Sequence, residues 1–590
     1  MRLNRTLLLL VLPALFGADW KLADTPLTTP WTADVDPAHP LPDYPRPQMV
    51  RKDWTNLNGL WDFAIRPQKD TSGGNYDGRI LVPFPVESAL SGVKKPLTPA
   101  DRLWYRRRFT APNRKGQRLL VHFGAVDWRG EVWVNGKPVG QHEGGYDPFS
   151  FDITSALSGK GSDEIVVAVW DPSDDGPQPR GKQVLNPNSI WYTAVSGIWQ
   201  TVWLEPVPEH YVSELSLTPD LDGKKLQLTV QSSAAGPFSA VVTLKGKTVG
   251  RVSGRLNAPA AVALSEIDPW SPDTPTLYDL EVSLPDGDRV SGYFGMSKIE
   301  IGKDAAGFNR MFLNGRPIFG IGPLDQGWWP DGLYTAPTDA ALRSDIDTLK
   351  KMGFNLLRKH VKVEPARYYY WCDKLGMMVW QDLPSAEPKE HPSVKRGAPA
   401  DVAFATAEDA IFRRELQALL HNLHNSPSVI AWVPFNEGWG EHDTNAILQW
   451  VKSQDPGRLV NGPSGWEDRG YGDMKDRHDY PGPSMFPVMP DRASVLGEFG
   501  GLGLPVEGHL WWNKRNWGYR TFDDLAKLQA AYEDLIAKLD PLVKQGLAAA
   551  IYTQTTDVEG EVNGLMTYDR KVIKFDVEKL AQLHRRLIGQ

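Results

Sequence analysis

The sequence predicts a multidomain fold that combines β and α/β architecture, with two β-sandwiches followed by a C-terminal (β/α)8 barrel of the TIM type. Up to about residue 300 the chain consists of short apolar runs interrupted by Gly, Pro and Asn, which is typical of antiparallel β-structure. After Gly302, apolar strands alternate with helical stretches, which indicates parallel β/α units. The length of 590 residues leaves room for three to four domains of roughly 100–200 residues each.

The first β unit is expected between residues 48 and 207 as a jelly-roll β-sandwich. Apolar runs such as Leu119–Phe123 and Glu164–Trp170 supply its strands, and Asn135-Gly136 directly follows another run. Both of these residues tolerate a positive φ, so the pair predicts a tight hairpin. A second β unit is expected between residues 208 and 299, because a length of about 90 residues suits an immunoglobulin-like sandwich.

The barrel is expected between residues 300 and 590, where the chain contains eight candidate strands. These are Ile318–Ile321, Asn355–Arg358, Met377–Gln381, Val429–Pro434, Leu459–Gly462, Arg477–Tyr480, Ser494–Gly497 and Ala549–Gln554. Eight is the number of strands that closes a (β/α)8 barrel. Between the third and fourth strands, residues 407–423 place apolar side chains at helical spacing, which predicts one of the surrounding helices.

The N-terminal 47 residues predict export and an extended segment. Residues 1–18 combine Arg2 and Arg5 with the apolar run Leu7–Phe16 and small residues, which is the order of a secretory signal peptide. The apolar run is too short to anchor the chain in a bilayer. We therefore expect a periplasmic or secreted protein without a membrane anchor. Residues 19–47 are rich in Pro, Thr and Asp, which predicts a linker or a surface strap.

Composition excludes several classes of partner and cofactor. The formal net charge is −7 and no block of Lys or Arg stands out, so nucleic acid is not an expected partner. Cys372 is the single cysteine, which excludes an intramolecular disulfide and a thiolate metal cluster. The chain has no His-Glu-x-x-His helix and no calcium loop, so we expect neither a metal nor a cofactor in its site.

Two glutamates end predicted barrel strands. The apolar strand that begins at Val429 runs into Asn436-Glu437-Gly438, and the strand that begins at Ser494 runs into Glu498. Catalytic side chains of such barrels lie at these carboxyl ends. Glu437 is flanked by Trp432, Phe435 and Trp439, and an apolar pocket would keep its acid protonated.

Paired carboxyl groups are what glycoside hydrolysis requires, because one protonates the leaving oxygen while the other attacks the anomeric carbon. Glu437 is the candidate acid/base and Glu498 the candidate nucleophile. A single glutamate at a barrel rim would be read as a structural ion-pair partner, and the pair makes the catalytic interpretation the stronger one. A carbohydrate-binding protein without activity is the alternative from another functional class.

The order of short motifs along the chain resembles glycoside hydrolase family 2, which includes β-galactosidases, β-glucuronidases and β-mannosidases. The motifs are Leu57–Phe63, Leu103–Phe109, Val132–Gly136, Gly197–Leu204, Pro269–Tyr278, Tyr293–Gly295, Phe312–Gly315, Gly353–Asn355, Cys372–Gly376 and Asn425–Val429. The resemblance covers nearly everything after the linker. It implies a sugar-binding first sandwich, a catalytic barrel and a carbohydrate substrate, with a homo-oligomer possible.

The resemblance also implies roles for individual residues. Glu437 and Glu498 match the acid/base and the nucleophile of the family. Asn436 is expected to bond the sugar 2-hydroxyl, and Tyr480 to orient the nucleophile. His360 matches a histidine beside the terminal sugar, for which the alternative is a structural histidine bonded to the backbone.

Three further side chains are expected to contact substrate, and two of them lie at positions where the sequence departs from the family pattern. Asp382 ends the third strand where many members have an acidic pair, and Tyr552 lies on the eighth strand where a Trp is common. Asp325 follows the first strand and could accept a sugar hydroxyl.

The class of sugar that the protein accepts is predicted from the absence of a cationic residue. Characterised β-glucuronidases carry an Asn-x-Lys motif for the sugar carboxylate, and its region here reads Glu561-Val-Asn563-Gly564 without the Lys. Glu559 lies in the same loop, so two carboxylates would repel a uronate. The sequence therefore favours a retaining exo-β-glycosidase that acts on a neutral sugar, a β-galactosidase first. A β-glucuronidase or β-galacturonidase is the alternative, with Arg520, Arg570 or Lys571 supplying the cation.

Overall fold

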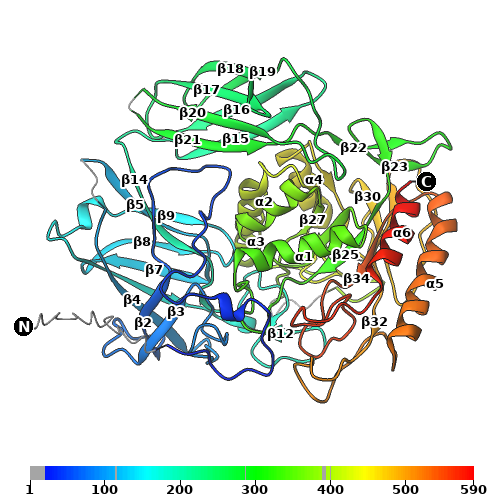
Figure 1. Ribbon diagram of the computed structural model, residues 1–590, viewed down its shortest axis with the longest axis horizontal. Helices are drawn as coiled ribbons and strands as arrows, with labels where there is room; N and C mark the ends of the chain where they lie inside the picture. The colour runs from blue at the N-terminus through cyan, green and yellow to red at the C-terminus, as the bar shows by residue number, and fades with distance from the viewer. Residues whose placement is uncertain (1–19, 113–115, 286, 388–393, 399, 590) are drawn as a thin grey trace, which may run out of the picture.

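The computed structural model describes residues 20–112, 116–285, 287–387, 394–398 and 400–589. Figure 1 shows three parts: a first sandwich in blue and cyan, a second sandwich in green above it, and a barrel that runs from green to red. The predicted signal peptide, residues 1–18, lies outside the described residues, so export stays a prediction. Among the described helices, none combines the length and the apolar character that crossing a membrane requires.

The first unit is a β-sandwich with its core between two antiparallel sheets. One sheet has the order β1 (Thr55–Asn56), β14 (Val202–Val207), β5 (Arg118–Phe123), β9 (Phe149–Asp152), and the other β3 (Gly78–Val82), β2 (Gly59–Pro67), β4 (Asp101–Phe109), β10 (Asp163–Trp170), β7 (Arg129–Val134), β8 (Lys137–Glu143). The predicted hairpin joins β7 to β8, and Asn135 and Gly136 have φ of 50° and 76°. Positive φ at both central residues is the geometry of a type I′ turn.

The second unit is a smaller sandwich. Its sheets have the orders β15 (Glu214–Asp220), β16 (Lys225–Gln231), β19 (Pro259–Ala263) and β18 (Lys247–Arg255), β17 (Pro237–Leu244), β20 (Tyr278–Ser283), β21 (Arg289–Phe294). Alternate side chains such as Leu226, Leu228 and Val230 are buried between the sheets, while their neighbours are partly exposed. This alternation is the one that the sequence showed.

The C-terminal unit is the predicted barrel, and each of the eight predicted strands overlaps an observed one. The sheet order is β29 (Leu459–Val460), β28 (Val429–Val433), β27 (Met378–Asp382), β26 (Leu356–Lys359), β25 (Gly320–Asp325), β34 (Leu547–Thr553), β31 (Ala493–Gly500), β30 (Met474–Asp479). A parallel bridge between Asn461 and Met474 links the two ends of this order. The helices are α1 (Asp339–Lys351), α2 (Ala366–Leu375), α3 (Thr406–Leu423), α4 (Thr444–Gln454), α5 (Leu525–Lys544) and α6 (Val577–Ile588).

A small sheet covers the amino-terminal end of the barrel. Its strands are β22 (Ile299–Lys303), β23 (Asn309–Leu313) and β24 (Arg316–Ile318). Met311 and Leu313 of β23 join one apolar cluster with interior side chains such as Leu356 and Val495. The floor of the barrel is therefore packed, and substrate can reach the interior only from the carboxyl ends of the strands.

The segment before the first sandwich is a strap that contacts its neighbours at several points. Leu27 is buried in the apolar cluster that contains the barrel helices. Thr29 and Thr32 donate hydrogen bonds to the Asp331 carboxylate over 2.7 and 2.5 Å. Further along, Val50 and Ser291 of the second sandwich exchange backbone hydrogen bonds.

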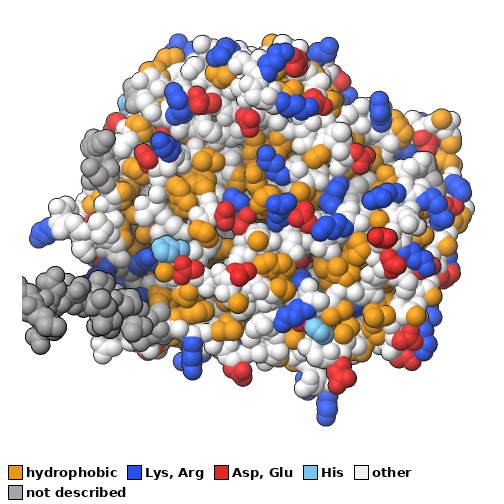
Figure 2. Space-filling model, viewed as in Figure 1, with side chains coloured by type: hydrophobic (Ala, Val, Ile, Leu, Met, Phe, Trp, Pro, Cys, Tyr) orange, Lys and Arg blue, Asp and Glu red, His pale blue; other side chains and the backbone are white. Residues whose placement is uncertain are grey.

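The surface carries no block of one charge on the face in Figure 2, where Lys and Arg side chains are interspersed with Asp and Glu. A cavity of about 390 Å³ lies where the strap, the first sandwich and the barrel meet, and it is lined by aromatic side chains such as Trp199 and Trp203. Its lining includes neither Glu437 nor Glu498. Cavity size alone would therefore not locate the site that the sequence predicts.

Candidate active site

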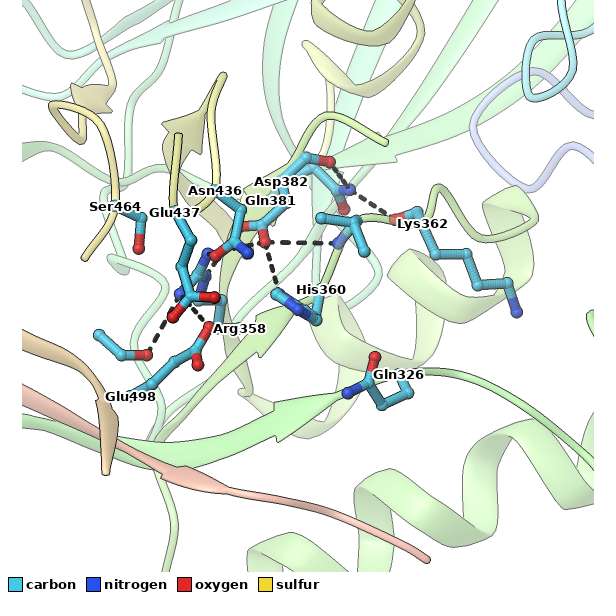
Figure 3. Close-up of polar contacts among 12 residues, drawn as sticks. Gln326, Arg358, His360, Lys362, Gln381, Asp382, Asn436, Glu437, Ser464 and Glu498 are labelled. Carbon is cyan, nitrogen blue, oxygen red and sulfur yellow. Dashed lines mark hydrogen bonds and ion pairs between the residues drawn. The ribbon is translucent and has the colours of Figure 1, made fainter. Parts of the chain in front are cut away.

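The structure brings Glu437 and Glu498 together at the carboxyl ends of their strands. Glu437 follows β28 and Glu498 lies in β31. One carboxylate oxygen of each lies within 4.8 Å of the other and of a ring nitrogen of His478. In Figure 3 the two carboxylates point toward one another. The predicted pairing of the two glutamates is thus present in the fold.

The backbone at Glu437 adopts a conformation that few non-glycine residues take. Glu437 has a φ of 53° and is followed by Gly438 at 80°. Its amide donates to the carbonyl of Ser464 over 2.8 Å, which fixes the turn. Left-handed backbone at a non-glycine residue costs on the order of 1–3 kcal/mol and is concentrated at functional sites. Here the turn directs the Glu437 side chain toward Glu498.

His478 of β30 lies between the two glutamates. Its Nδ1 is 2.7 Å from Glu437 Oε1 and 3.4 Å from Glu498 Oε2. Its Nε2 is 2.7 Å from Ser464 Oγ, and this hydroxyl donates to Asp476 over 2.8 Å. Burial lowers the pKa of His478, but the neighbouring carboxylates outweigh burial and raise it. Because the carboxylate of Glu437 can only accept, Nδ1 carries a proton and donates to it.

The apolar pocket predicted for Glu437 is absent, which corrects the sequence analysis. Trp432 belongs to the apolar cluster on the helix side of the sheet, and Phe435 stacks on Phe412 at 5.4 Å. Burial still raises the pKa of Glu437. The effects of His478 and of the cations Lys182 and Arg358 outweigh burial and hold the pKa below its ordinary value. In the free protein the proton of the Glu437–His478 pair therefore resides on His478.

Glu498 is held by a hydroxyl and a guanidinium. Tyr480 donates to Glu498 Oε2 over 2.6 Å, and Arg358 to Oε1 over 3.2 Å. Thr553 Oγ1 lies 2.7 Å from the Tyr480 oxygen. Since the single proton of Tyr480 goes to the carboxylate, Thr553 is the donor of this second bond. Burial and the charge of Glu437 raise the pKa of Glu498, while His478, Arg358 and Tyr480 oppose the shift.

Arg358 is a fully buried cation that the sequence analysis did not assign to the site. Its Nε and one terminal nitrogen donate to the two oxygens of Asp382, both over 2.9 Å. It also donates to Asn436 Oδ1 over 2.7 Å. Asp382 accepts from His360 Nδ1 at 3.0 Å as well. Both oxygens of Asp382 are thus engaged by protein donors, so it orients Arg358 and His360, and its role as a substrate contact stays a prediction.

Asn436 and His360 each keep one polar atom free for a ligand. The Asn436 amide nitrogen is buried and has no hydrogen-bond partner among the residues that the structure describes, so it can donate to a sugar hydroxyl. Burial and the charge of Lys182 hold the pKa of His360 well below its usual range. The ring is therefore neutral, with its proton on Nδ1 toward Asp382 and Nε2 left as an acceptor.

Two predicted substrate contacts are occupied by other neighbours. Asp325 accepts from Lys359 over 2.9 Å and from Tyr368 over 2.5 Å, so its carboxylate is already neutralised. Tyr552 is buried on the helix side of β34, where its ring centroid is 4.9 Å from that of Tyr532 in α5. Side chains alternate along a strand, and Thr553 is the one that reaches the site. Tyr552 as a substrate contact was therefore wrong.

Loops of the first sandwich complete the rim of the site, and the sequence analysis did not foresee this. Tyr192 donates to Glu561 over 2.5 Å, and the Thr193 hydroxyl donates to Glu559 over 2.6 Å. The ring centroid of Trp191 is 5.0 Å from that of Trp439, which follows Glu437 by two residues. No local pattern could have indicated contacts between segments more than 240 residues apart.

The donor atoms of Glu437, His478 and Glu498 are close enough to hold a metal ion. His478 Nδ1 lies 2.7 Å from Glu437 Oε1 and 3.4 Å from Glu498 Oε2, so the three groups already contact one another directly. The hydrogen bonds among the three side chains account for their arrangement. The expectation that the site needs no metal stays a prediction.

Three family models match consecutive parts of the chain. They are described as the sugar binding domain of glycosyl hydrolases family 2 over residues 75–208, glycosyl hydrolases family 2 over residues 210–296, and the TIM barrel domain of that family over residues 329–474. The chain belongs to glycoside hydrolase family 2.

Relatives of this family-2 chain carry two kinds of name. A beta-galactosidase of Thermoanaerobacter pseudethanolicus is 24% identical over 360 residues, which is 58% of this chain and 45% of that protein. The fold is similar to those of beta-glucuronidases from Dictyoglomus thermophilum (TM-score 0.72, 18% identity, 92% and 98% of the two chains) and Ruminococcus gnavus (0.74, 16%, 92% and 99%). The chain spans less than half the length of the curated relatives it matches first.

Proposed function

We propose that this protein is a retaining exo-β-glycosidase that releases terminal β-linked sugars by double displacement. The observation that carries the proposal is the close approach of the Glu437 and Glu498 carboxylates, whose oxygens lie within 4.8 Å. Retaining enzymes hold their two carboxyl groups about 5–5.5 Å apart, whereas inverting enzymes separate them by about 6.5–9.5 Å to admit a water. The geometry supports the retaining class.

In the first step Glu498 attacks the anomeric carbon while Glu437 protonates the departing oxygen. Tyr480 and Arg358 each occupy one oxygen of Glu498, which orients the carboxylate and opposes the rise in its pKa. Glu437 needs a proton for its role, and the proton on His478 Nδ1 is one hydrogen bond away at 2.7 Å. As negative charge develops on the leaving oxygen, this proton passes to Glu437 and on to the aglycone.

In the second step Glu437 acts as the base. It takes a proton from a water that attacks the anomeric carbon and breaks the ester bond to Glu498. His478 restores the starting state by sharing the recovered proton with Glu437. The free amide of Asn436 faces the position where a donor to the 2-hydroxyl is expected, and this bond strengthens in the transition state.

The enclosure of the site supports action at a chain end. The side chains of Glu437 and Glu498 are 13% and 6% exposed. The floor of the barrel is packed by β23, and loops of the first sandwich contact the rim. A site enclosed in this way accommodates a terminal residue more readily than the middle of a polysaccharide.

For the identity of the sugar, the sequence favours a β-galactoside because the Asn-x-Lys motif is missing. Two of the substitute cations considered for a uronate are placed elsewhere. Arg570 stacks on Trp329 at 3.8 Å and pairs with Asp345, and Arg520 is exposed on β33 (Arg520–Thr521). A different residue, Lys182 of the first sandwich, favours an acidic sugar.

The test is a panel of 4-nitrophenyl β-glycosides combined with NMR of the first-formed product. We expect hydrolysis with release of the β-anomer, and loss of turnover in Glu498→Gln. An α-anomer as first product would contradict the retaining mechanism. Binding of sugars without any turnover would instead support the carbohydrate-binding alternative.

A further inference from the structure

Lys182 of the first sandwich is a buried cation without a partner. It directly precedes β11 (Gln183–Val184) and is 5% exposed. Among the described residues, none accepts a hydrogen bond from its ammonium, and no carboxylate lies within the 4.0 Å of an ion pair. The ring centroid of Tyr192 lies 5.6 Å from its Nζ. Burying an ammonium without a hydrogen-bonded anion is costly, so an unpaired one inside a protein needs an explanation.

The ammonium lies at the catalytic end of the barrel. The neighbouring Gly181 lies against the carbonyl of Val361, the residue that follows His360. Burial lowers the pKa of Lys182, and the carboxylates of Glu561, Glu498 and Glu437 oppose this shift. Each of these carboxylates has a protein donor of its own: Glu561 accepts from Tyr192, Glu498 from Tyr480, and Glu437 from His478. Lys182 therefore lies close to the candidate site, and within the described part of the chain its ammonium has no direct partner.

The loop that carries Lys182 is fixed on the barrel rim. The amides of Arg180 and Gly181 both donate to the Ser385 carbonyl, over 3.0 and 3.1 Å. Gly181 has a φ of 61°, and a Cβ at this position would lie 2.3 Å from the carbonyl oxygen of Val361. The Lys182 carbonyl accepts from Tyr192 over 2.9 Å. Lys182 is thus positioned before any ligand arrives.

The loop with Glu559 and Glu561, which the sequence predicts to repel a uronate, holds the segment around Lys182 and Tyr192 in place. Glu559 accepts from the amide and the hydroxyl of Thr193, and burial raises its pKa to about 7. Glu561 accepts from Tyr192 and from Asn563. These carboxylates bind the neighbouring segment of the first sandwich, so the loop repels an anionic sugar less than the sequence indicates.

We propose that Lys182 binds an anionic substituent of the terminal sugar, which makes β-uronides the preferred substrate class. This inference rests on the proposed glycosidase function and names its specificity. The carboxylate at C6 of a uronide supplies the anion that Lys182 lacks, and a charge-assisted hydrogen bond in a buried site discriminates strongly. A neutral sugar leaves the ammonium unpaired.

The experiment compares matched substrates that differ only at C6, namely 4-nitrophenyl β-D-galactoside with β-D-galacturonide and β-D-glucoside with β-D-glucuronide. In the unaltered protein kcat/KM should be higher for a uronide than for its neutral partner. Lys182→Met should lower kcat/KM for the uronide on the order of 100-fold, mainly through KM, because a buried charge pair is broken. The neutral substrate should change little. Arg520→Met, which removes an exposed cation, is the control and should alter neither.

The outcomes are distinguishable. Failure of all four substrates would contradict the proposed function itself. Hydrolysis of the neutral sugars in preference to the uronides would overturn the role of Lys182 alone. Equal loss for both classes in Lys182→Met would also overturn it, since Lys182 would then act through Glu437 or Glu498. A second experiment tests the same preference without any variant. It compares inhibition of the unaltered protein by D-glucuronate with inhibition by D-glucose, and D-glucuronate should inhibit more strongly.

Discussion

Replacement of Tyr480 by Phe removes one hydroxyl from the proposed nucleophile. The ring is retained by its stacking on Tyr519 at a centroid distance of 3.7 Å, so the fold should tolerate the change. The lost bond is a 2.6 Å donation to the Glu498 carboxylate. A hydrogen bond to a charged group contributes about 1.5–3 kcal/mol. The corresponding fall in kcat is roughly 10- to 150-fold.

The same substitution should move the acidic limb of the pH profile. Glu498 must be ionised to attack, so activity falls as the pH drops through its pKa. Tyr480 is among the groups that lower this pKa, and its loss raises the pKa further. The acidic limb of kcat/KM should therefore shift to higher pH, as measured with a 4-nitrophenyl glycoside over a series of buffers at constant ionic strength.

Tyr552→Phe is the matched control. Tyr552 lies on the strand that carries Thr553, but its side chain is buried on the far side of the sheet. Its removal should leave kcat and the pH profile unchanged. Equal effects of the two substitutions, or an unaltered kcat in Tyr480→Phe, would refute the assignment of Tyr480 to the nucleophile.

Three other substitutions test the remaining parts of the site. Glu437→Gln should lower kcat/KM for an alkyl β-glycoside on the order of 10²- to 10⁴-fold but spare a 2,4-dinitrophenyl glycoside, whose leaving group needs no proton; equal losses in a steady-state comparison would show another role. His478→Gln should shift the acidic limb of kcat/KM upward, because Glu498 loses the cation that most opposes its raised pKa; a downward shift would contradict the assignment. Asp382→Asn should lower the free energy of unfolding by about 3–5 kcal/mol in urea titrations, because it leaves Arg358 buried without its charge partner; a loss under about 1 kcal/mol would argue against the pairing.

The barrel and its two glutamates could be predicted because their signals are local. Buried parallel strands are continuous apolar runs, and a polar residue at the end of such a run is conspicuous. Val429–Val433 before Glu437 and Ala493–Gly500 around Glu498 both have this form. His478 escaped notice because β30 alternates buried and half-buried polar residues instead of forming an apolar run.

The wrong predictions concern the face of a strand on which a side chain lies and the residues that face it from other parts of the chain. Tyr552 was chosen because the family commonly has a Trp at this point of the eighth strand, but alternation directs Thr553 to the site and Tyr552 to α5. The pKa of Glu437 was predicted from neighbours in sequence, whereas the groups that determine it come from β30 and from the first sandwich. Lys182 is 255 positions from Glu437, so only the folded chain reveals their proximity.

The strap also has a consequence for how the protein comes apart. Within about 30 residues it inserts Leu27 among the barrel helices, bonds Asp331 through two threonines and pairs Val50 with the second sandwich. Melting of one unit therefore removes partners from the others, which couples their stabilities. The sandwiches and the barrel should therefore unfold together in one cooperative calorimetric transition. After a single proteolytic cut in the strap, this one transition should split into several transitions.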